Sequence, residues 1–125
     1  LNLHFPLAEF MQDKKLNIKL NEKLQLEFRL LNERLEDSLP RMQSDYDLVY
    51  HDPFSPKRMP ELWTLDIFRI YASLLQTRCG AVLTYSCATA VGSGLIRSGF
   101  HLGRTAAVGR KSGGTIAALD PGDYR

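Results

Sequence analysis

The segment Asp47-Leu48-Val49-Tyr50-His51-Asp52-Pro53-Phe54-Ser55-Pro56 decides the fold of this chain. Apolar residues typical of a β-strand run into a carboxylate, and a turn of proline, phenylalanine and serine follows. The two prolines stiffen this turn because each fixes its own φ angle. In open α/β sheets, ligands bind beyond the carboxyl ends of the strands. The segment therefore predicts a binding site at Asp52 and Phe54.

On either side of this turn, strand patterns alternate with helix patterns. Strands are predicted over 24–30, 46–51, 81–86, 100–107 and 115–119, and helices over 7–15, 34–42, 61–76 and 89–98. Such alternation indicates a mostly parallel sheet with helices on both faces. The strand over 46–51 is expected to be buried on both faces, and Gly80 to end the preceding helix. The glycine-rich segment 109–114 predicts a closing antiparallel hairpin.

Length and composition indicate one domain of a globular protein. The chain has 125 residues, of which 44% are hydrophobic and 24% charged. No apolar stretch approaches the ~20 residues that span a bilayer. No basic-then-apolar leader opens the chain, so we expect a cytoplasmic protein without a membrane partner. The first residue is Leu1 rather than Met, which indicates a portion of a longer protein.

The charge is unevenly distributed along the chain. Residues 1–52 hold 7 Lys and Arg against 10 Asp and Glu, whereas residues 53–125 hold 9 against 4. A basic carboxyl half suits a nucleic-acid partner. An ordinary solvated surface is the alternative explanation.

The cysteines and histidines do not predict a metal site. Cys79 and Cys87 flank an apolar segment and are expected to be buried thiols, while His4, His51 and His101 have no ligand spacing.

Three blocks of the sequence carry a resemblance to a known family. The run over 52–64, Asp-Pro-Phe-Ser-Pro-Lys-Arg-Met-Pro-Glu-Leu-Trp-Thr, resembles the signature of the MnmC-like methyltransferase family. That signature has Asp, a small residue, Phe, Ser or Ala, Pro, two variable residues, Asn, Pro, and then Leu-Trp or Met-Trp. The stretch 80–86 resembles the next strand of the family, and 98–111 resembles its closing segment. The match covers roughly residues 24–119 with the family's spacing.

The resemblance implies an α/β fold with a partial class I methyltransferase (Rossmann-like) sheet. This sheet is mostly parallel and closes with an antiparallel hairpin. The family's first strand and its glycine-rich turn are missing from these residues. The expected organisation is therefore one partial methyltransferase domain over 1–125, with an uncertain segment over 1–23, a core over 24–119 and a loose tail over 120–125. Without the first strands, the strand over 24–30 lacks its usual neighbour and is expected to stay exposed or to pair elsewhere.

The resemblance also implies an activity. The family methylates an aminomethyl group on the wobble uridine of certain tRNAs, with S-adenosyl-L-methionine as the methyl donor. Asp52 would then be catalytic, taking or holding the proton of the amine and aiming its nitrogen. A fused or separate oxidase domain is a further expected partner.

Other residues receive roles from the same resemblance. Substrate-binding residues would be Pro53, Phe54, Ser55, Pro56, Lys57 and Trp63, and Phe54 could stack on the uracil ring. Cofactor-binding residues would be Asn32, Glu33, Asp52 and Tyr85. Phosphate contacts would come from Arg58, Arg104, Arg110 and Lys111. Two departures stand out: Met59 replaces the signature Asn, and Gly92 occupies a position where many relatives carry Arg.

Each of these residues also has a purely structural explanation. Asp52 could cap the helix after the turn, and Phe54, Trp63 and Tyr85 could be core residues. Arg110 and Lys111 could form the polar tip of a hairpin. At the level of function, two alternatives to the tRNA methyltransferase remain: a catalytically incomplete remnant that binds nucleic acid, and a small-molecule amine methyltransferase.

Overall fold

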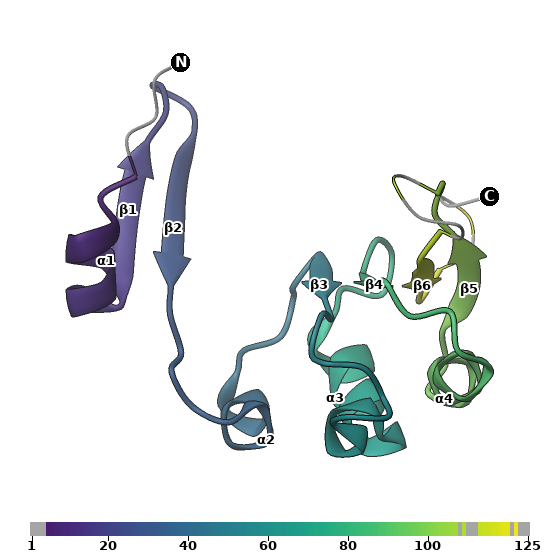
Figure 1. Cartoon of the computed structure of the whole chain (residues 1–125). Coiled ribbons are helices and arrows are strands. Elements are labelled where there is room, and N and C mark those ends of the chain that lie inside the picture. Colours follow the sequence, from purple (N-terminus) through teal and green to yellow (C-terminus); the bar gives the residue numbers. More distant parts are fainter. Residues whose placement is uncertain (1–4, 108, 110–112, 121, 123–125) are drawn as a thin grey trace. The chain divides into compact units, whose positions relative to one another are not determined.

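The protein is represented by a computed structural model that describes residues 5–107, 109, 113–120 and 122. The chain divides into two compact units, Leu1–Arg34 and Leu35–Arg125. Figure 1 colours both units along the sequence, and each is described by itself. The boundaries expected for a single partial domain stay a prediction.

The first unit consists of one helix and one β-hairpin. Helix α1 (Leu7–Asp13) ends at Lys14, whose φ of 59° is left-handed and whose N–H donates to the Phe10 carbonyl. Strands β1 (Lys15–Lys19) and β2 (Gln25–Arg29) then pair in antiparallel register. The strand that the sequence predicts over 24–30 thus forms, and it pairs with β1 in a two-stranded sheet of its own.

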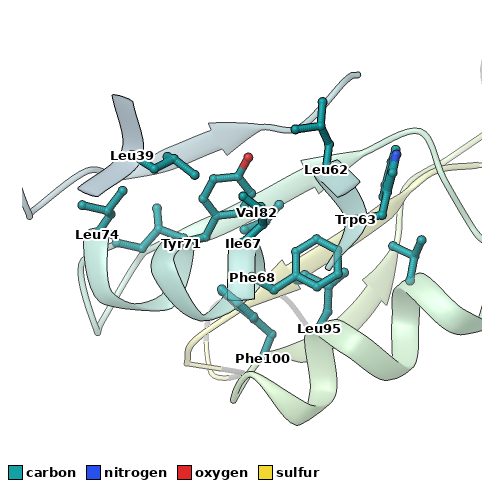
Figure 2. Close-up of a cluster of buried hydrophobic side chains, with 13 residues drawn as sticks. Leu39, Leu62, Trp63, Ile67, Phe68, Tyr71, Leu74, Val82, Leu95 and Phe100 are labelled. Carbon is teal, nitrogen blue, oxygen red and sulfur yellow. The ribbon is translucent and has the colours of Figure 1, made fainter. Parts of the chain in front are cut away.

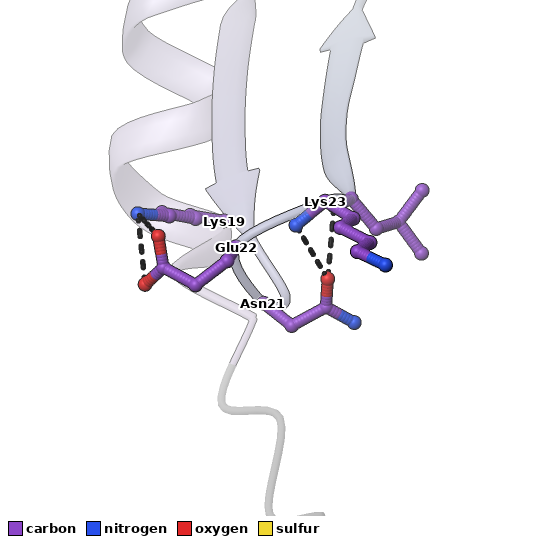
Figure 3. A network of polar contacts seen from close by, with 5 residues as sticks. Lys19, Asn21, Glu22 and Lys23 are labelled. Atoms are coloured by element: carbon purple, nitrogen blue, oxygen red, sulfur yellow. Dashed lines mark hydrogen bonds and ion pairs between the residues drawn. The ribbon is translucent and has the colours of Figure 1, made fainter.

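Asn21 and Lys19 make the side-chain contacts that hold the hairpin turn (Figure 3). The Asn21 side-chain oxygen accepts hydrogen bonds from the backbone N–H groups of Lys23 and Leu24, at 2.8 and 3.0 Å. The Lys19 ammonium lies 3.4 Å from the Glu22 carboxylate. An asparagine that bonds its own backbone two and three residues on is a common way to make a turn, and it fixes the register of this hairpin.

The second unit contains a four-stranded mixed sheet in the order β3-β4-β6-β5. Its strands are β3 (Leu48–Tyr50), β4 (Ala81–Thr84), β5 (His101–Arg104) and β6 (Thr115–Ala118). β3 and β4 are parallel, and β6 is antiparallel to both β4 and β5. The predicted closing antiparallel hairpin is therefore confirmed.

Helices pack on this sheet through a single core. They are α2 (Leu35–Ser38), the 3₁₀ helices η1 (Leu39–Arg41) and η2 (Pro60–Trp63), α3 (Leu65–Leu74) and α4 (Thr89–Arg97). Figure 1 shows α3 and α4 on the same side of the sheet. Between them and the sheet lie Phe68, Leu95 and Val82, all less than 2% exposed (Figure 2). Burying such side chains contributes about 1.5–3 kcal/mol each.

The expectation that β3 is buried on both faces is wrong. Leu48 is 40% exposed and Tyr50 is 76% exposed, whereas Val49 packs against the core. Side chains alternate between the two faces of a strand. Leu48 and Tyr50 therefore share the face opposite α3, and no helix among the described residues of the second unit covers that face.

The predicted helix over 61–76 forms as two pieces. η2 and α3 are separated by Thr64, whose extended backbone (φ −83°, ψ 158°) breaks the helix. Its hydroxyl then accepts a hydrogen bond from the Ile67 N–H at 3.4 Å and so caps α3. Gly80 does not end this helix, because Leu75 already has an extended backbone. Gly80 instead allows a close approach, since a Cβ there would lie 2.4 Å from the Gln76 carbonyl oxygen.

The cysteines are not buried thiols, contrary to expectation. Cys79 is half-buried and Cys87 is exposed. Both lie next to β4 rather than in it, so the apolar strand they flank does not carry them into the core.

Candidate functional site

Asp52 lies at the carboxyl end of β3, where the sequence predicts it. The backbone N–H of His51 donates to the Leu83 carbonyl at 2.8 Å and extends the β3–β4 pairing by one residue. Asp52 follows immediately and is exposed to solvent. The N-cap residues of the next two helices are Met59 and Thr64. Asp52 therefore caps neither helix.

Two aromatic side chains hold the backbone of the turn after Asp52. The Trp63 indole Nε1 donates to the Phe54 carbonyl at 2.9 Å, and the Tyr85 hydroxyl donates to the Pro53 carbonyl at 3.1 Å. The two rings meet edge to face with their centroids 6.1 Å apart. A further bond, from the Met59 N–H to the Ser55 carbonyl at 3.0 Å, closes the turn. The turn is thus fixed both from η2 and from the end of β4.

Phe54 is not a core residue. Its side chain is 59% exposed, and the Arg58 guanidinium carbon lies 4.5 Å from the centroid of its ring. This distance is typical of a cation–π contact. Trp63, in contrast, is only 9% exposed, so it combines a core position with a hydrogen bond to the turn.

Two pockets meet at Asp52 and Tyr85. A pocket of about 490 Å³ is lined by Tyr50, His51, Asp52, Leu83, Thr84, Tyr85, Thr105, Ala106, Gly113 and Gly114. A second pocket of about 760 Å³ is lined by Asp52, Pro53, Phe54, Ser55, Arg58, Met59, Leu62 and Tyr85. Only Asp52 and Tyr85 are common to both linings. Asp52 therefore lies in the wall that the two pockets share.

Comparison with known proteins identifies the family. A family model described as S-adenosyl-L-methionine-dependent methyltransferase matches residues 2–120. The chain belongs to this methyltransferase family. The predicted recognition and cofactor are thereby confirmed at the level of the family, whose methyl donor is S-adenosyl-L-methionine.

Individual relatives agree with this membership. The methyltransferase chain is 39% identical over 85 residues to the tRNA 5-methylaminomethyl-2-thiouridine biosynthesis bifunctional protein MnmC of Ralstonia nicotianae, covering 67% of this chain and 13% of that protein. It is 38% identical over 76 residues to an uncharacterised protein of Methanocaldococcus jannaschii, covering 61% of this chain and 21% of that protein. The chain thus spans 13% to 21% of the length of these relatives.

A solved structure has the same fold, which confirms the predicted fold class. The crystal structure of MNMC2 from Aquifex aeolicus superposes with a TM-score of 0.71 at 30% sequence identity. The match covers 94% of this methyltransferase chain and 38% of the Aquifex chain.

The pocket of about 490 Å³ has features that suit the methyl donor of the family. That donor combines a planar adenine with a positively charged sulfonium. The exposed Tyr50 ring offers a flat apolar face, and the Asp52 carboxylate offers a negative charge. Gly113 and Gly114 add backbone without side chains to the same lining. These residues of the methyltransferase chain therefore fit such a group.

The structure does not bring all the predicted site residues together. Asn32 and Glu33 are exposed residues of the first unit, which is described by itself. Arg104 is exposed on β5 and lines a separate pocket of about 350 Å³. Arg110 and Lys111 lie outside the described residues. The roles assigned to all of these residues stay predictions.

Sequence reasoning missed His51 as a member of this site. Its ring is 3% exposed, and its Nδ1 lies 2.8 Å from the Tyr71 hydroxyl oxygen. Burial lowers the pKa of His51 to about 4, an effect that the Leu62 backbone and the Asp52 carboxylate only partly oppose. The only available signal was its position directly before Asp52.

Proposed function

We propose that this chain carries the substrate side of an S-adenosyl-L-methionine-dependent methyltransferase that N-methylates the aminomethyl group of a tRNA wobble uridine. The observation that carries this proposal is the position of Asp52, shared by two adjacent pockets at the carboxyl end of β3. A transfer between two bound molecules needs its polar group at such a boundary.

The role of Asp52 follows from the chemistry of amines. An alkylamine is mostly protonated at neutral pH and then has no lone pair with which to attack. The bound donor supplies an electrophilic methyl group. The negative charge of Asp52 holds the substrate ammonium in place, and the carboxylate then accepts a proton from it, which frees the nitrogen lone pair. Because the carboxylate is exposed in the pocket wall, a substrate can reach it without a rearrangement of the core.

The pocket of about 760 Å³, which Phe54 and Arg58 line, suits a nucleobase. Phe54 offers an exposed ring on which a base can stack, and Arg58 already covers part of that ring. Lys57 is also exposed in the same turn. Lys57 and Arg58 can therefore both contact phosphates of the nucleic-acid backbone. Ser55, Pro53 and Pro56 shape the turn that presents them.

The names of the relatives support tRNA as the substrate class. The word "bifunctional" in the same name supports a second activity besides methylation, and an oxidase domain, fused or separate, is the partner that we propose for it. A tRNA substrate would place the reaction in the cytoplasm. In the described residues, no helix is long and apolar enough to cross a membrane.

The test is methyl transfer by the full-length protein from labelled donor to tRNA that carries an aminomethyl uridine. We expect Asp52→Asn to lower kcat about 100-fold or more, with donor affinity nearly unchanged. Asp66→Asn is the matched control, because Asp66 is an exposed carboxylate of α3 that pairs only loosely with Arg69, at 3.8 Å. Normal turnover by Asp52→Asn would refute the role of Asp52.

Two other outcomes would favour the alternative functions. Methylation of free alkylamines but not of tRNA would indicate a small-molecule enzyme. Salt-sensitive tRNA binding without any transfer would indicate a binding remnant.

A further inference from the structure

The His51 side chain connects three elements around the turn. It extends from the end of β3, its Nδ1 lies 2.8 Å from the Tyr71 hydroxyl of α3, and its ring meets the Trp63 indole of η2 edge-on at 4.6 Å. The Phe68 ring also lies edge-on to His51, and the two ring centroids are 6.0 Å apart. Within the described residues, Nε2 has no hydrogen-bond partner.

The protonation of this pair can be assigned from its surroundings. Burial keeps the His51 ring neutral at pH 7 and raises the pKa of the Tyr71 hydroxyl above its usual value. A neutral imidazole has one donor and one acceptor nitrogen. We assign the hydrogen bond as one from the Tyr71 hydroxyl to Nδ1, which leaves the ring proton on Nε2. The ring is then held by this neutral bond, and the Leu62 backbone is a second polar neighbour of the ring.

The His51 ring is connected in two ways to the segment that carries Asp52. Along the backbone, His51 directly precedes Asp52. Through space, its ring supports Trp63, and Trp63 holds the Phe54 carbonyl at 2.9 Å. Asp52 lies between these two points of support. A shift of the His51 ring would therefore move both ends of the segment that carries the carboxylate.

We propose that His51 is a positioning residue that sets the Asp52 carboxylate at the wall shared by the two pockets. This inference rests on the proposed function. His51 itself touches neither reactant through Nδ1, because Tyr71 occupies that nitrogen in the core. Misplacing a reacting group by about 1 Å can cost 100-fold in rate, so the effect of His51 should appear in kcat rather than in donor affinity.

Three variants of the full-length protein separate positioning from simple packing. His51→Phe keeps a ring of similar size but removes Nδ1, and Tyr71→Phe removes only the hydroxyl partner. His51→Asn places an amide close to the position of Nδ1 and can keep the bond to Tyr71. We expect His51→Phe and Tyr71→Phe to lower kcat about 10- to 100-fold. His51→Asn should recover part of that loss, while the donor Kd stays within about twofold of the original in all three variants.

The control is Phe100→Leu. Phe100 belongs to the same core near α4 and is 3% exposed, so this variant shortens a buried side chain. Figure 2 shows Phe100 beside Phe68 and Leu95 and apart from Trp63. This variant should lose stability and keep kcat. Equal kcat losses in Phe100→Leu and Tyr71→Phe would overturn the proposal, because both would then reflect general destabilisation.

A second readout does not depend on activity. Trp63 is the only tryptophan of these 125 residues, and Trp63→Phe identifies its indole N–H resonance in an NMR spectrum. We expect this resonance to shift and its hydrogen to exchange faster in His51→Phe and Tyr71→Phe, but not in Phe100→Leu. An unchanged resonance in the first two variants would overturn the positioning role. A shifted resonance in a protein that methylates no tRNA would support the positioning role while refuting the proposed function.

Discussion

The Trp63 indole donates its hydrogen to the Phe54 carbonyl at 2.9 Å across a span of nine residues. The bond crosses the turn that carries Asp52 and connects the middle of this turn to η2, in which Leu62 and Trp63 are buried. Tyr85 binds the preceding carbonyl, that of Pro53, from the end of β4. Two consecutive carbonyls are thus held by side chains from two different elements. The backbone of the exposed part of the site is therefore anchored to the core by two side chains.

The anchor from Tyr85 can be tested by removing one oxygen atom. Tyr85→Phe deletes the hydroxyl that donates to Pro53 and keeps the ring that packs on Trp63. We expect a loss of about 1 kcal/mol in the free energy of unfolding and a fall of about tenfold in kcat from a looser turn. Chemical denaturation and steady-state kinetics measure the two effects. Tyr46→Phe, which removes a hydroxyl from a residue that is 39% exposed, should change neither, and a normal kcat in Tyr85→Phe would count against a rigid turn.

Phe54 should contribute to substrate affinity rather than to stability. Its ring is 59% exposed, so Phe54→Leu removes little buried area. Stacking of a base on an aromatic ring is worth about 1–3 kcal/mol, and we therefore expect KM for tRNA to rise about 5- to 100-fold while the thermal midpoint stays nearly constant. Phe54→Tyr keeps the aromatic face and should behave like the original protein. If Phe54→Leu left KM unchanged, the base would have to bind elsewhere.

The central part of this site could be predicted from the sequence because its signals are local. An apolar run that ends in Asp-Pro-Phe-Ser-Pro allows little besides a strand followed by a stiff turn, and the structure has β3 and the turn in that order. The closing hairpin was predictable for the same reason, since glycines separate two apolar runs. These features depend on neighbours in the sequence.

The features that the sequence did not reveal depend on tertiary contacts. The hairpin partner β1 alternates apolar Leu16 and Ile18 with polar residues over only five positions, which is too short a pattern to recognise alone. The break at Thr64 interrupts an otherwise continuous apolar stripe, because η2 must place Trp63 against the turn. The burial of His51 is set by Tyr71, which lies 20 residues away.

The two glycines of α4 should respond differently to the same substitution. A Cβ at Gly94 would lie 2.9 Å from Cε2 of Phe68, which is 1% exposed and has no room to move. A Cβ at Gly92 would lie 3.2 Å from a methyl of Leu102, which is 40% exposed. We expect Gly94→Ala to lower the free energy of unfolding by about 1–3 kcal/mol.

Gly92→Ala is the internal control for this comparison. It should raise the free energy of unfolding by up to about 1 kcal/mol, because alanine favours a helix more than glycine does. Urea denaturation of both variants gives the comparison directly. Equal effects at the two positions would mean that α4 does not pack on Phe68 as described.

The stability of the second unit should depend on pH through His51. Its folded pKa of about 4 lies below the ordinary value of 6.5, so the unfolded chain binds more protons between these two values. The free energy of unfolding therefore falls as the pH is lowered from about 6.5 towards 4, by about 3 kcal/mol in total. The polar groups that act on the ring are the Tyr71 hydroxyl from α3, the Leu62 backbone from η2 and the Asp52 carboxylate from the turn, and the hydroxyl keeps its proton throughout this range. Urea titrations at several pH values should show this slope in the original protein and in His101→Asn, a control at an exposed position on β5, but not in His51→Phe. A slope that survives in His51→Phe would have to come from other groups, and the buried neutral ring would then not be the source of the acid sensitivity.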